Sequence, residues 1–554
     1  MKKITSITQV FSNIINTNML YADKTKFIYN LLKEPQTYFL SRPRRFGKSL
    51  LLDTLNEVFL GNKELFRDLF IGKSDYNFTK YPIIRLNMDY DKVSDPIIIE
   101  KLIIDDLNHI ATCENINIST ITPGNALKSL IIKLYNKYNA KVVILIDEYD
   151  APILDKISDP ALAQANLEVL HGFYRSLKGV ENEIQFSFIT GISQLARKAM
   201  GQSVSNLVDL SLRPAYAEIC GFTMADVDRL FEDRYEGTLK NISGDYKEKL
   251  KTVDDLRQMI LDWYDGYNFG GQDRVLNPFS IINFFTNNEF DNYWLDSGPS
   301  RFLSTLIQKQ PTQFLNVLLT GHNEYLIKQN DINNINIVPM LYQTGYVTID
   351  KIVNFNDEKY YFFKLPNKEV KKAYALTVRT DFFSIENPDS LALVNNLQKA
   401  LLGRDAEWLG ICVHSLLASI PYFLHQGSES FYHGAIHGLF FCLDFEVRSE
   451  ALSAKGRSDL ALPLPGQVYA VIELKYVGAT AKADGDPAEV ARLLDKATQG
   501  ALGQILETGY LDPYLAKAKE IWPIGLAVYG RDQVKVSFGQ PVPGLNAATA
   551  GHSS

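Results

Sequence analysis

The sequence is poor in cysteine, and its four cysteines stand far apart. Cys113, Cys220, Cys412 and Cys442 form no C-x-x-C pair. Disulfide frameworks and zinc knuckles use closely spaced cysteines, so neither is indicated. Unpaired thiols fit a reducing compartment, and we expect a cytoplasmic protein.

The sequence also lacks a long hydrophobic run. No stretch reaches the roughly 20 apolar residues that a transmembrane helix needs. The N-terminal segment Met1-Lys2-Lys3-Ile4-Thr5 is basic, but it is not followed by the apolar core of a signal peptide. We therefore expect no membrane partner.

An excess of positive charge is missing as well. The formal net charge of the 554 residues is −7, with 46% hydrophobic and 22% charged residues. This is the composition of a soluble globular protein of about three to four domains. A nucleic-acid site would have to be a local basic patch, and Arg42, Arg44 and Arg45 are more simply explained by the phosphates of a nucleotide.

What the sequence does contain is a phosphate-binding motif. Gly47-Lys48-Ser49 lies between an apolar strand, Gln36 to Leu40, and an apolar helix from Leu50 onward. N–H groups at a helix N-terminus attract phosphate, the lysine adds charge for the β- and γ-phosphates, and the serine can ligate Mg²⁺. The full motif has glycine at position 42, and Arg42 weakens the match because arginine tolerates a left-handed backbone poorly. ATP is the first ligand to expect.

A second strand supports this prediction. Val142 to Ile146 form a continuous apolar run, typical of a buried parallel strand, and the run ends in Asp147 and Glu148. Asp147 would hold Mg²⁺, and Glu148 would orient or deprotonate the attacking water. A third strand, Ile184 to Ile189, ends in Thr190-Gly191-Ile192-Ser193. Thr190 and Ser193 are either γ-phosphate contacts or, more often in proteins, plain caps at a strand end.

The composition changes near residues 380 to 400, where we expect a domain boundary. The earlier part is rich in Asn, Ile and Asp, whereas Asn546 is the single asparagine after position 400. Before this boundary, apolar strands alternate with helices up to about Leu212, which predicts a parallel α/β sheet. The chain then turns helical, with expected helices at Met224 to Tyr235, at Leu256 to Tyr264 and after Asn277.

A short helix and a hairpin follow these helices. Pro339 to Thr344 reads as a helix that stops at Gly345, and Tyr346 to Ile349 and Tyr360 to Phe363 read as two strands. This order is compatible with a winged helix. Such a module is as often used for packing as for reading DNA.

The C-terminal part holds a second group of charged residues. Asp459 lies on a strand that turns back at 463–466 into the apolar strand Val468 to Tyr476, where Glu473 and Lys475 point to the same face. Buried charges need a partner or a metal. A metal-dependent phosphodiesterase would use Asp459 and Glu473 as Mg²⁺ ligands and Lys475 to position water or stabilise the transition state. From these residues alone, a structural Glu–Lys ion pair is the simpler alternative.

Two histidines, His433 and His437, are spaced four residues apart. A helix would align them as a metal pair, but no companion ligand has matching spacing, and ordinary helix histidines are the more common explanation.

With both sites in view, the chain resembles the AAA-ATPase-like proteins that carry a C-terminal PD-(D/E)xK nuclease domain, over nearly its whole length. The N-terminal motifs that carry the resemblance are Tyr21-Ala22-Asp23-Lys24-Thr25, 42–49, Ile146-Asp147-Glu148-Tyr149-Asp150, 190–193, 263–267, Asn277-Pro278 and 365–370. The family's own loop reads like this one at Arg42. The resemblance implies an ATPase of the ASCE type.

The resemblance extends to the C-terminal domain. Residues 429–434 resemble the family's first helix, whose acid, here Glu429, is an accessory metal ligand. Residues 456–459 and 473–475 match the family's core, and 501–505 with Tyr510 match its later helix, which places Gln504 in the catalytic set. The Ala- and Gly-rich segment 478–487 departs from the pattern beside the active strand. The implied fold is restriction-endonuclease-like.

These observations predict an α/β protein made of a P-loop NTPase with a parallel sheet, a helical lid that could include a winged helix, and a restriction-endonuclease-like domain. The expected ranges are 1–215, 216–385 and 386–540, with a disordered tail at 541–554. The residues expected to contact ATP are Arg45, Gly47, Lys48, Ser49, Asp147 and Thr190, and those expected to hold Mg²⁺ are Ser49, Asp147, Glu429, Asp459 and Glu473. The expected catalytic residues are Glu148, Asp459, Glu473, Lys475 and Gln504.

The expected function is an ATP-regulated, Mg²⁺-dependent nuclease that acts on DNA in preference to RNA and could form a nucleotide-dependent homo-oligomer. One alternative is a signalling ATPase whose terminal domain binds nucleic acid without cutting it. Another is a defence or effector protein that acts on a foreign or host target.

Overall fold

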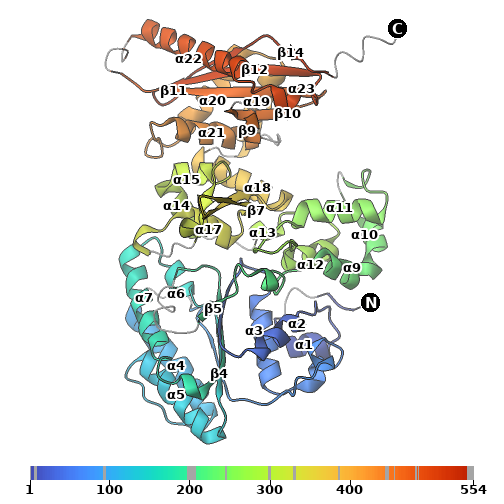
Figure 1. The fold of residues 1–554 in the computed structure, drawn as a ribbon, viewed down its shortest axis with the longest axis vertical. Coiled ribbons are helices and arrows are strands. Elements are labelled where there is room, and N and C mark those ends of the chain that lie inside the picture. The colour runs from blue at the N-terminus through green and yellow to red at the C-terminus, as the bar shows by residue number, and fades with distance from the viewer. Residues whose placement is uncertain are drawn as a thin grey trace. The chain divides into compact units, whose positions relative to one another are not determined.

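The computed structural model describes residues 2–4, 9–90, 95–195, 197, 207–243, 246–296, 301–327, 332–384, 387–442, 448–453, 456–480, 483 and 486–545. These residues form two compact units (Figure 1). Unit 1 comprises Met1–Leu303 and His322–Lys371, and unit 2 comprises Ser304–Gly321 and Lys372–Ser554. Within the described ranges, no helix combines the length and the apolarity needed to cross a membrane.

A five-stranded sheet forms the centre of the first part of unit 1. Its strands are β1 (Thr37–Ser41), β2 (Ile83–Asn87), β3 (Val142–Asp147), β4 (Ile184–Gly191) and β5 (Leu207–Asp209). Their order is β2-β3-β4-β1-β5 and every pair is parallel, which confirms the predicted sheet. β4 lies between the strand that precedes the phosphate loop and the strand that carries the acids. This is the ASCE arrangement that the resemblance implied.

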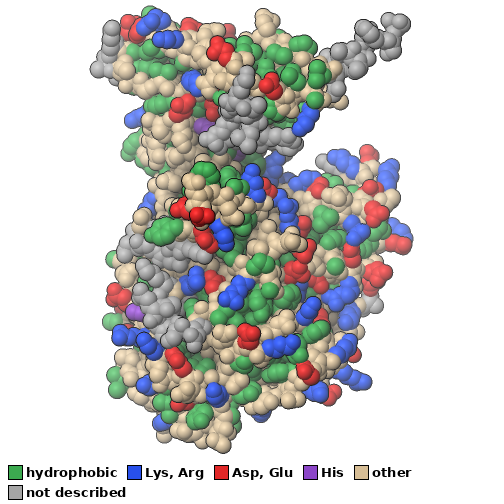
Figure 2. Space-filling model, viewed as in Figure 1, with side chains coloured by type: hydrophobic (Ala, Val, Ile, Leu, Met, Phe, Trp, Pro, Cys, Tyr) green, Lys and Arg blue, Asp and Glu red, His purple; other side chains and the backbone are tan. Residues whose placement is uncertain are grey.

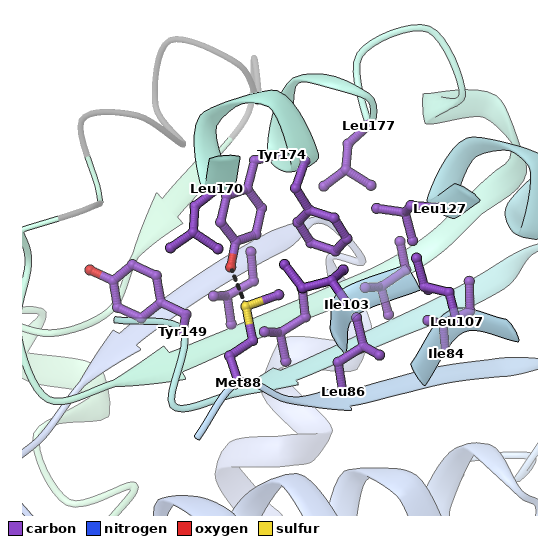
Figure 3. Packing of buried hydrophobic residues seen from close by; sticks show 14 of the residues in the cluster. Ile84, Leu86, Met88, Ile103, Leu107, Leu127, Tyr149, Leu170, Tyr174 and Leu177 are labelled. Carbon is purple, nitrogen blue, oxygen red and sulfur yellow. Dashed lines mark hydrogen bonds between the residues drawn. The ribbon is translucent and has the colours of Figure 1, made fainter. Parts of the chain in front are cut away.

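Helices cover this sheet. They are α1 (Phe11–Asn16), α2 (Thr25–Lys33), α3 (Lys48–Phe59), α4 (Pro96–Cys113), α5 (Pro123–Tyr138), α6 (Ala151–Leu154) and α7 (Pro160–Arg175), with short 3₁₀ turns at 63–66, 71–73, 181–183 and 214–216. α4, α5 and α7 each start with proline behind a capping side chain, from Asp95, Thr122 and Asp159 respectively. Their apolar faces pack on the sheet, where the Tyr174 hydroxyl contacts the Met88 sulfur at 3.7 Å (Figure 3).

A helical region follows in unit 1. It contains α9 (Met224–Phe231), η5 (Glu232–Arg234), α10 (Tyr235–Asn241), α11 (Val253–Tyr264), α12 (Pro278–Asn287) and α13 (Tyr293–Asp296). The helix expected over Met224 to Tyr235 is interrupted by the 3₁₀ turn η5. Asn277 caps α12 as predicted, because its Oδ1 accepts the Phe279 N–H at 2.9 Å.

The predicted helix and hairpin are present and are joined by one more strand. The elements are β6 (His322–Asn323), α16 (Glu324–Ile327), η7 (Ile332–Asn334), α17 (Ile337–Thr344), β7 (Thr348–Phe355) and β8 (Glu358–Lys364), with the strand order β6-β8-β7. Gly345 ends α17 in a left-handed conformation, with φ of 92°. All eight residues of α17 are buried. This helix is therefore a packing element here, with no face open to a DNA groove.

Unit 2 contains a second sheet. Its helices are α14 (Arg301–Lys309), α15 (Pro311–Asn316), α18 (Lys368–Thr377, shared with unit 1), the π-helical turn η8 (Val378–Phe382), α19 (Asn387–Leu402), α20 (Ala406–Ser419), α21 (Glu429–Cys442), α22 (Pro487–Glu507) and α23 (Asp512–Leu515). Its strands are β9 (Arg448–Ser453), β10 (Gly456–Leu464), β11 (Val468–Val477), β12 (Glu520–Tyr529), β13 (Gln533–Phe538) and β14 (Val542–Pro543).

The strands of unit 2 are ordered β13-β12-β11-β10-β9, with β14 on β12, and the pair β11–β12 is parallel while the others are antiparallel. α22 packs on β12 so closely that a Cβ on Gly525 would lie 2.4 Å from the Thr498 carbonyl oxygen. Glycine is required at that position.

The unit boundary lies at Lys371 and Lys372, slightly earlier than the expected position after residue 385. Residues 304–321, which the sequence places in the lid region, belong to unit 2. The reason is that α15 contacts α21: the Asn316 Nδ2 donates to the Ser430 Oγ at 2.6 Å. Of the expected tail at 541–554, residues 542–543 form β14, and 546–554 lie outside the described residues, as do 481–482 and 484–485 of the segment 478–487. The domain ranges from sequence stay predictions.

Candidate functional sites

Two residues of the phosphate loop of unit 1 have a left-handed backbone, and Arg42 is not one of them. Gly47, the N-cap of α3, has φ of 92°, and Arg45 has φ of 67°. Arg42 is not among the residues with positive φ. The missing glycine at position 42 therefore imposes no strain on this loop, and the objection based on Arg42 is removed.

Arg42 has a structural role, which corrects its assignment to the nucleotide phosphates. Its side chain is 1% exposed. The guanidinium donates to the carbonyl oxygens of Ser41, Ser211 and Tyr216 at 2.9 to 3.1 Å. It also lies 4.1 Å from the ring centre of Phe269. These contacts hold the base of the loop against the segment that follows β5.

Lys48, Ser49, Asp147 and Glu148 meet at the carboxyl edge of the sheet. The Lys48 ammonium donates to the Pro43 carbonyl oxygen at 3.3 Å and lies 3.9 Å from the Glu148 Oε1. The Ser49 hydroxyl is hydrogen-bonded to Asp147, and burial raises the pKa of Asp147. A hydroxyl beside a buried carboxylate is an oxygen pair suited to Mg²⁺. The structure thus brings together four of the residues predicted for this site.

The loop after β4 is held by a residue whose role the sequence did not reveal. The buried Asp150 carboxylate accepts the N–H groups of Ile192 and Ser193 at 3.2 and 2.6 Å. Burial, followed by the charge of Glu148, raises the pKa of Asp150 to about 6. A Cβ on Gly191 would lie 2.2 Å from Asp150, which explains the glycine there. Asp150 thereby fixes the β4 loop to the end of β3.

Thr190 and Ser193 lie in this loop region. Thr190 is fully buried and its Oγ1 has no hydrogen-bond partner, while its backbone oxygen accepts the Tyr149 N–H. Thr190 is not among the residues that line the adjacent cavity. Its contact with ATP stays a prediction.

A cavity of about 490 Å³ opens at the phosphate loop. Its polar lining includes Arg44, Arg45, Lys48, Ser49 and Glu148. Its apolar lining includes side chains from three segments far apart in sequence, Ile14, Leu20, Tyr21, Phe222, Phe279 and Ile282. The Arg45 guanidinium carbon lies 5.1 Å from the ring centre of Phe279, so cationic and apolar lining residues meet there. A cavity lined by both cationic and apolar side chains suits a nucleoside triphosphate.

The N-terminal segment and the lid region close the cavity together. Lys24 lines it and forms an ion pair of 2.8 Å with Asp226, which belongs to the capping box of α9. Both side chains are largely buried, at 12% and 13% exposed. Tyr21, Ala22 and Lys24 of the motif Tyr21 to Thr25 thus form part of the wall of this cavity, which the sequence alone did not indicate.

The second site lies on β10 and β11 of unit 2. Leu460 pairs with Ile472, which sets Asp459 beside Glu473, and the Asp459 Oδ2 accepts the Leu474 N–H at 2.8 Å. The side chain of Glu473 is 3% exposed, and its Oε2 is buried without a hydrogen-bond partner. Burial, followed by the charge of Asp459, raises the pKa of Glu473 to about 7. The two acids are adjacent, as expected.

Lys475 lies between acids from two elements. Its ammonium is 3.0 Å from the Glu473 Oε1 and 3.9 Å from the Glu429 Oε1 at the start of α21. Burial alone would lower the pKa of Lys475, but the hydrogen bond to Glu473 and its charge raise it. The structure therefore gathers Glu429, Asp459, Glu473 and Lys475 in one place.

The remaining candidates of unit 2 are placed differently. The Gln504 Nε2 donates to the Tyr510 hydroxyl at 3.1 Å, and no hydrogen bond joins Gln504 to the acids among the described residues. The His433 Nε2 lies 3.1 Å from the Asp459 carbonyl oxygen, so this histidine faces the strand of the acids. Burial, and then the charge of His433, lowers the pKa of His437 to about 3, which leaves it neutral. The role of Gln504 stays a prediction.

The donor set of unit 2 fits a divalent cation in part. A buried carboxylate oxygen without a partner, next to a second carboxylate, is a place where a cation would offset repulsion and burial. Among the described side chains, however, no three His, Cys, Asp or Glu residues already converge on one metal position. Glu429 points to Lys475, so a cation would be held first by Asp459 and Glu473.

Two stretches of the chain match known protein families. Residues 6–200 match the family described as predicted AAA-ATPase, and residues 427–538 match the PD-(D/E)XK nuclease superfamily. These matches confirm the resemblance drawn from the motifs. A protein of Azotobacter chroococcum mcd 1, described as an uncharacterized protein in the vnfD 5' region, is 29% identical over 544 residues, which cover 97% of this chain and 98% of that protein.

Proposed function

We propose, from the AAA-ATPase-like and PD-(D/E)XK domains that the chain carries, that it is an ATP-hydrolysing protein coupled to a Mg²⁺-dependent nuclease that cuts DNA. The observation that carries the nuclease half is the unpartnered, buried Oε2 of Glu473 beside Asp459. A structural ion pair with Lys475 would satisfy one oxygen of Glu473 and leave the other one unexplained. A bound cation accounts for both oxygens.

In the ATPase half, each residue has a distinct task. Lys48 would leave the Pro43 carbonyl oxygen for the phosphates, which offer a stronger acceptor. Ser49 and Asp147 would hold Mg²⁺, and Glu148 would orient water. Arg45 would stand between the base and the phosphates. The apolar side chains that line the cavity would contact the base.

In the nuclease half, Asp459 and Glu473 would hold the cation and Lys475 would stabilise the phosphate charge that develops during cleavage. Bound Mg²⁺ would supply a Lewis acid that polarises the phosphodiester and activates water. Glu429 would keep Lys475 in place or join the metal ligands once Lys475 turns to the phosphate. The choice of Mg²⁺ and DNA, a cytoplasmic location and nucleotide-dependent self-association also belong to the proposal.

One experiment tests the core of this proposal. Purified protein is incubated with supercoiled plasmid, with and without Mg²⁺ and ATP, next to the double variant Asp459→Ala/Glu473→Ala. We expect metal-dependent nicking or linearisation that the double variant has lost. Equal cutting by both proteins would mean that the acids are a structural pair. No cutting under any condition would favour a signalling ATPase.

A further inference from the structure

Two aromatic side chains of unit 2 lie exposed in the segment that leads to the nuclease residues. Tyr422 is 77% and Phe423 is 59% exposed, and their ring centres are 5.8 Å apart. They follow α20 and precede α21, the helix that starts at Glu429. Large aromatic rings normally bury most of their surface, so an adjacent exposed pair indicates a binding surface.

The segment that presents this pair is fixed on both sides. Leu424 is fully buried, and its N–H donates to the Pro421 carbonyl oxygen at 2.9 Å, which closes a turn around the two rings. The Gln426 Oε1 accepts a hydrogen bond of 2.5 Å from the Thr312 hydroxyl. The rings are therefore held out on an anchored turn. Presenting them in this way costs little further ordering when a ligand binds.

The same segment touches the strand of the active residues. A Cβ on Gly427 would lie 3.0 Å from the Tyr476 hydroxyl, and Tyr476 directly follows Lys475 on β11. Phe423 lies six positions before Glu429, and six residue steps of extended chain span at most roughly 20 Å. The aromatic pair thus lies within about 20 Å of Glu429 and on the segment that borders the site.

The turn between β12 and β13 brings one residue of each charge near this segment. Arg531 and Asp532 both act electrostatically on His425 and Tyr432, with opposite signs. The Tyr432 hydroxyl donates to the Gly530 carbonyl oxygen at 2.8 Å, which places that turn against α21. Exposed aromatic rings are the surface on which unpaired bases stack.

We propose that Tyr422 and Phe423 form a base-stacking subsite that takes unpaired nucleotides of single-stranded DNA, or of a frayed duplex end, next to the cleavage site. This inference rests on the proposed nuclease function and specifies its substrate class. Bases paired inside a duplex are stacked on one another and do not present their faces to side chains. A stacking subsite therefore selects single-stranded DNA over duplex DNA.

The test measures binding with the full chain and without cleavage, in EDTA. Fluorescein-labelled dT₁₂ and a blunt hairpin duplex of the same length are titrated and followed by anisotropy. We expect tighter binding of dT₁₂, a loss of about tenfold for Tyr422→Ala and for Phe423→Ala, and about a hundredfold for the double variant. Duplex affinity should change less than about twofold. The variant Tyr422→Trp/Phe423→Trp should bind dT₁₂ about as tightly as the unmodified chain, because tryptophan also stacks on bases.

A control and a local probe complete the test. Trp408 is also exposed, at 42%, but lies at the other end of α20, so Trp408→Ala should bind dT₁₂ as the unmodified chain does. A 2-aminopurine in the oligonucleotide should be quenched by the unmodified chain and not by the double alanine variant. Unchanged dT₁₂ affinity in that variant, or a stronger preference for duplex, would overturn the inference, as would a change of oligomeric mass with intact binding.

Failure of this inference is distinguishable from failure of the proposed function. If Asp459→Ala/Glu473→Ala abolished cleavage while the aromatic variants bound and cut normally, the stacking subsite alone would be wrong. If the unmodified chain neither bound nor cut any DNA with ATP and metal, both would be wrong.

Discussion

Both candidate sites pair a lysine with a glutamate, but they hold the pair in opposite ways. In unit 1, Lys48 is 4% exposed, stands 3.9 Å from Glu148 and donates a hydrogen bond of 3.3 Å to the Pro43 carbonyl oxygen. In unit 2, Lys475 is 31% exposed and is hydrogen-bonded to Glu473 at 3.0 Å. Lys48 is thus loosely held and ready to turn to phosphate. Lys475 is engaged by the acids that a cation would need.

The difference is one of construction. The candidate nucleotide site is made mainly by backbone, from a loop and a helix N-terminus, and distant segments of the chain supply the side chains of its cavity wall. The candidate nuclease site is made by side chains of two adjacent strands. Figure 2 shows Lys and Arg side chains interspersed with Asp and Glu over the visible face, consistent with the net charge of −7. Recognition of polyanions here depends on such local arrangements.

The largest expected effect is at Lys48 and Glu148, the lysine–glutamate pair of unit 1. Lys48→Ala should weaken ATP binding by about a hundredfold or more, because the charge that meets the phosphates is lost. Glu148→Gln should keep ATP affinity and lose hydrolysis by a factor on the order of 10² to 10⁴, since it acts on water in the reaction. Calorimetry measures the ATP affinity, and a phosphate-release assay measures the rate of hydrolysis. Unchanged affinity in Lys48→Ala would remove the phosphate-loop assignment.

In unit 2, Asp459, Glu473 and Lys475 should act together as one site. Asp459→Ala, Glu473→Ala and Lys475→Ala should each abolish metal-dependent cleavage, and combined variants should lose little more than single ones. ATP binding should be retained, because these residues are in unit 2. Cleavage rates of all single and double variants, with ATP affinity as the control, provide the comparison. Strictly multiplicative losses would contradict a shared metal site.

A third test compares two arginines of the phosphate loop. Arg42→Met should lower the free energy of unfolding by about 2 to 4 kcal/mol, because three carbonyl oxygens lose a buried donor. Arg45→Ala should leave stability nearly unchanged and weaken ATP binding about tenfold. Denaturant unfolding and calorimetry on both variants would show whether the roles are divided in this way. A stable Arg42→Met with weak ATP binding would reverse the assignment.

The smallest effect concerns a buried acid that is hydrogen-bonded to neutral donors. Glu369 accepts the Ser280 hydroxyl and the Trp294 N–H, and burial raises its pKa from 4.5 to about 8. Between these values the folded protein holds a proton that the unfolded chain releases, so stability falls as pH rises. Glu369→Gln should flatten the melting temperature between pH 5 and 8, and the exposed Glu289→Gln should not. An unchanged pH profile would mean that Glu369 is already ionised at pH 5.

Much of the fold follows from patterns along the chain. The buried strand before Asp147, the cap at Asn277 and the stop at Gly345 are local signals, and the pairing of Asp459 with Glu473 follows from one tight turn. What the sequence did not show depends on contacts between distant segments. Arg42 is buried by Ser211 and Tyr216, Asp150 holds the β4 loop, and 304–321 joins unit 2 through Ser430. No spacing of residues along the sequence indicates that these partners meet in the fold.

The buried helix α17 touches both sides of the nucleotide site. Its Gln343 Oε1 accepts the Gln194 N–H after β4 at 3.0 Å, and a Cβ on Gly345 would lie 3.1 Å from Pro43 of the phosphate loop. The hairpin β7–β8 follows this helix and exposes Ile352, Val353 and Phe355. The phosphate loop, the segment after β4 and an exposed apolar hairpin are therefore joined through one buried helix. A displacement of the phosphate loop would act directly on α17, because Gly345 leaves no free space between the end of this helix and Pro43.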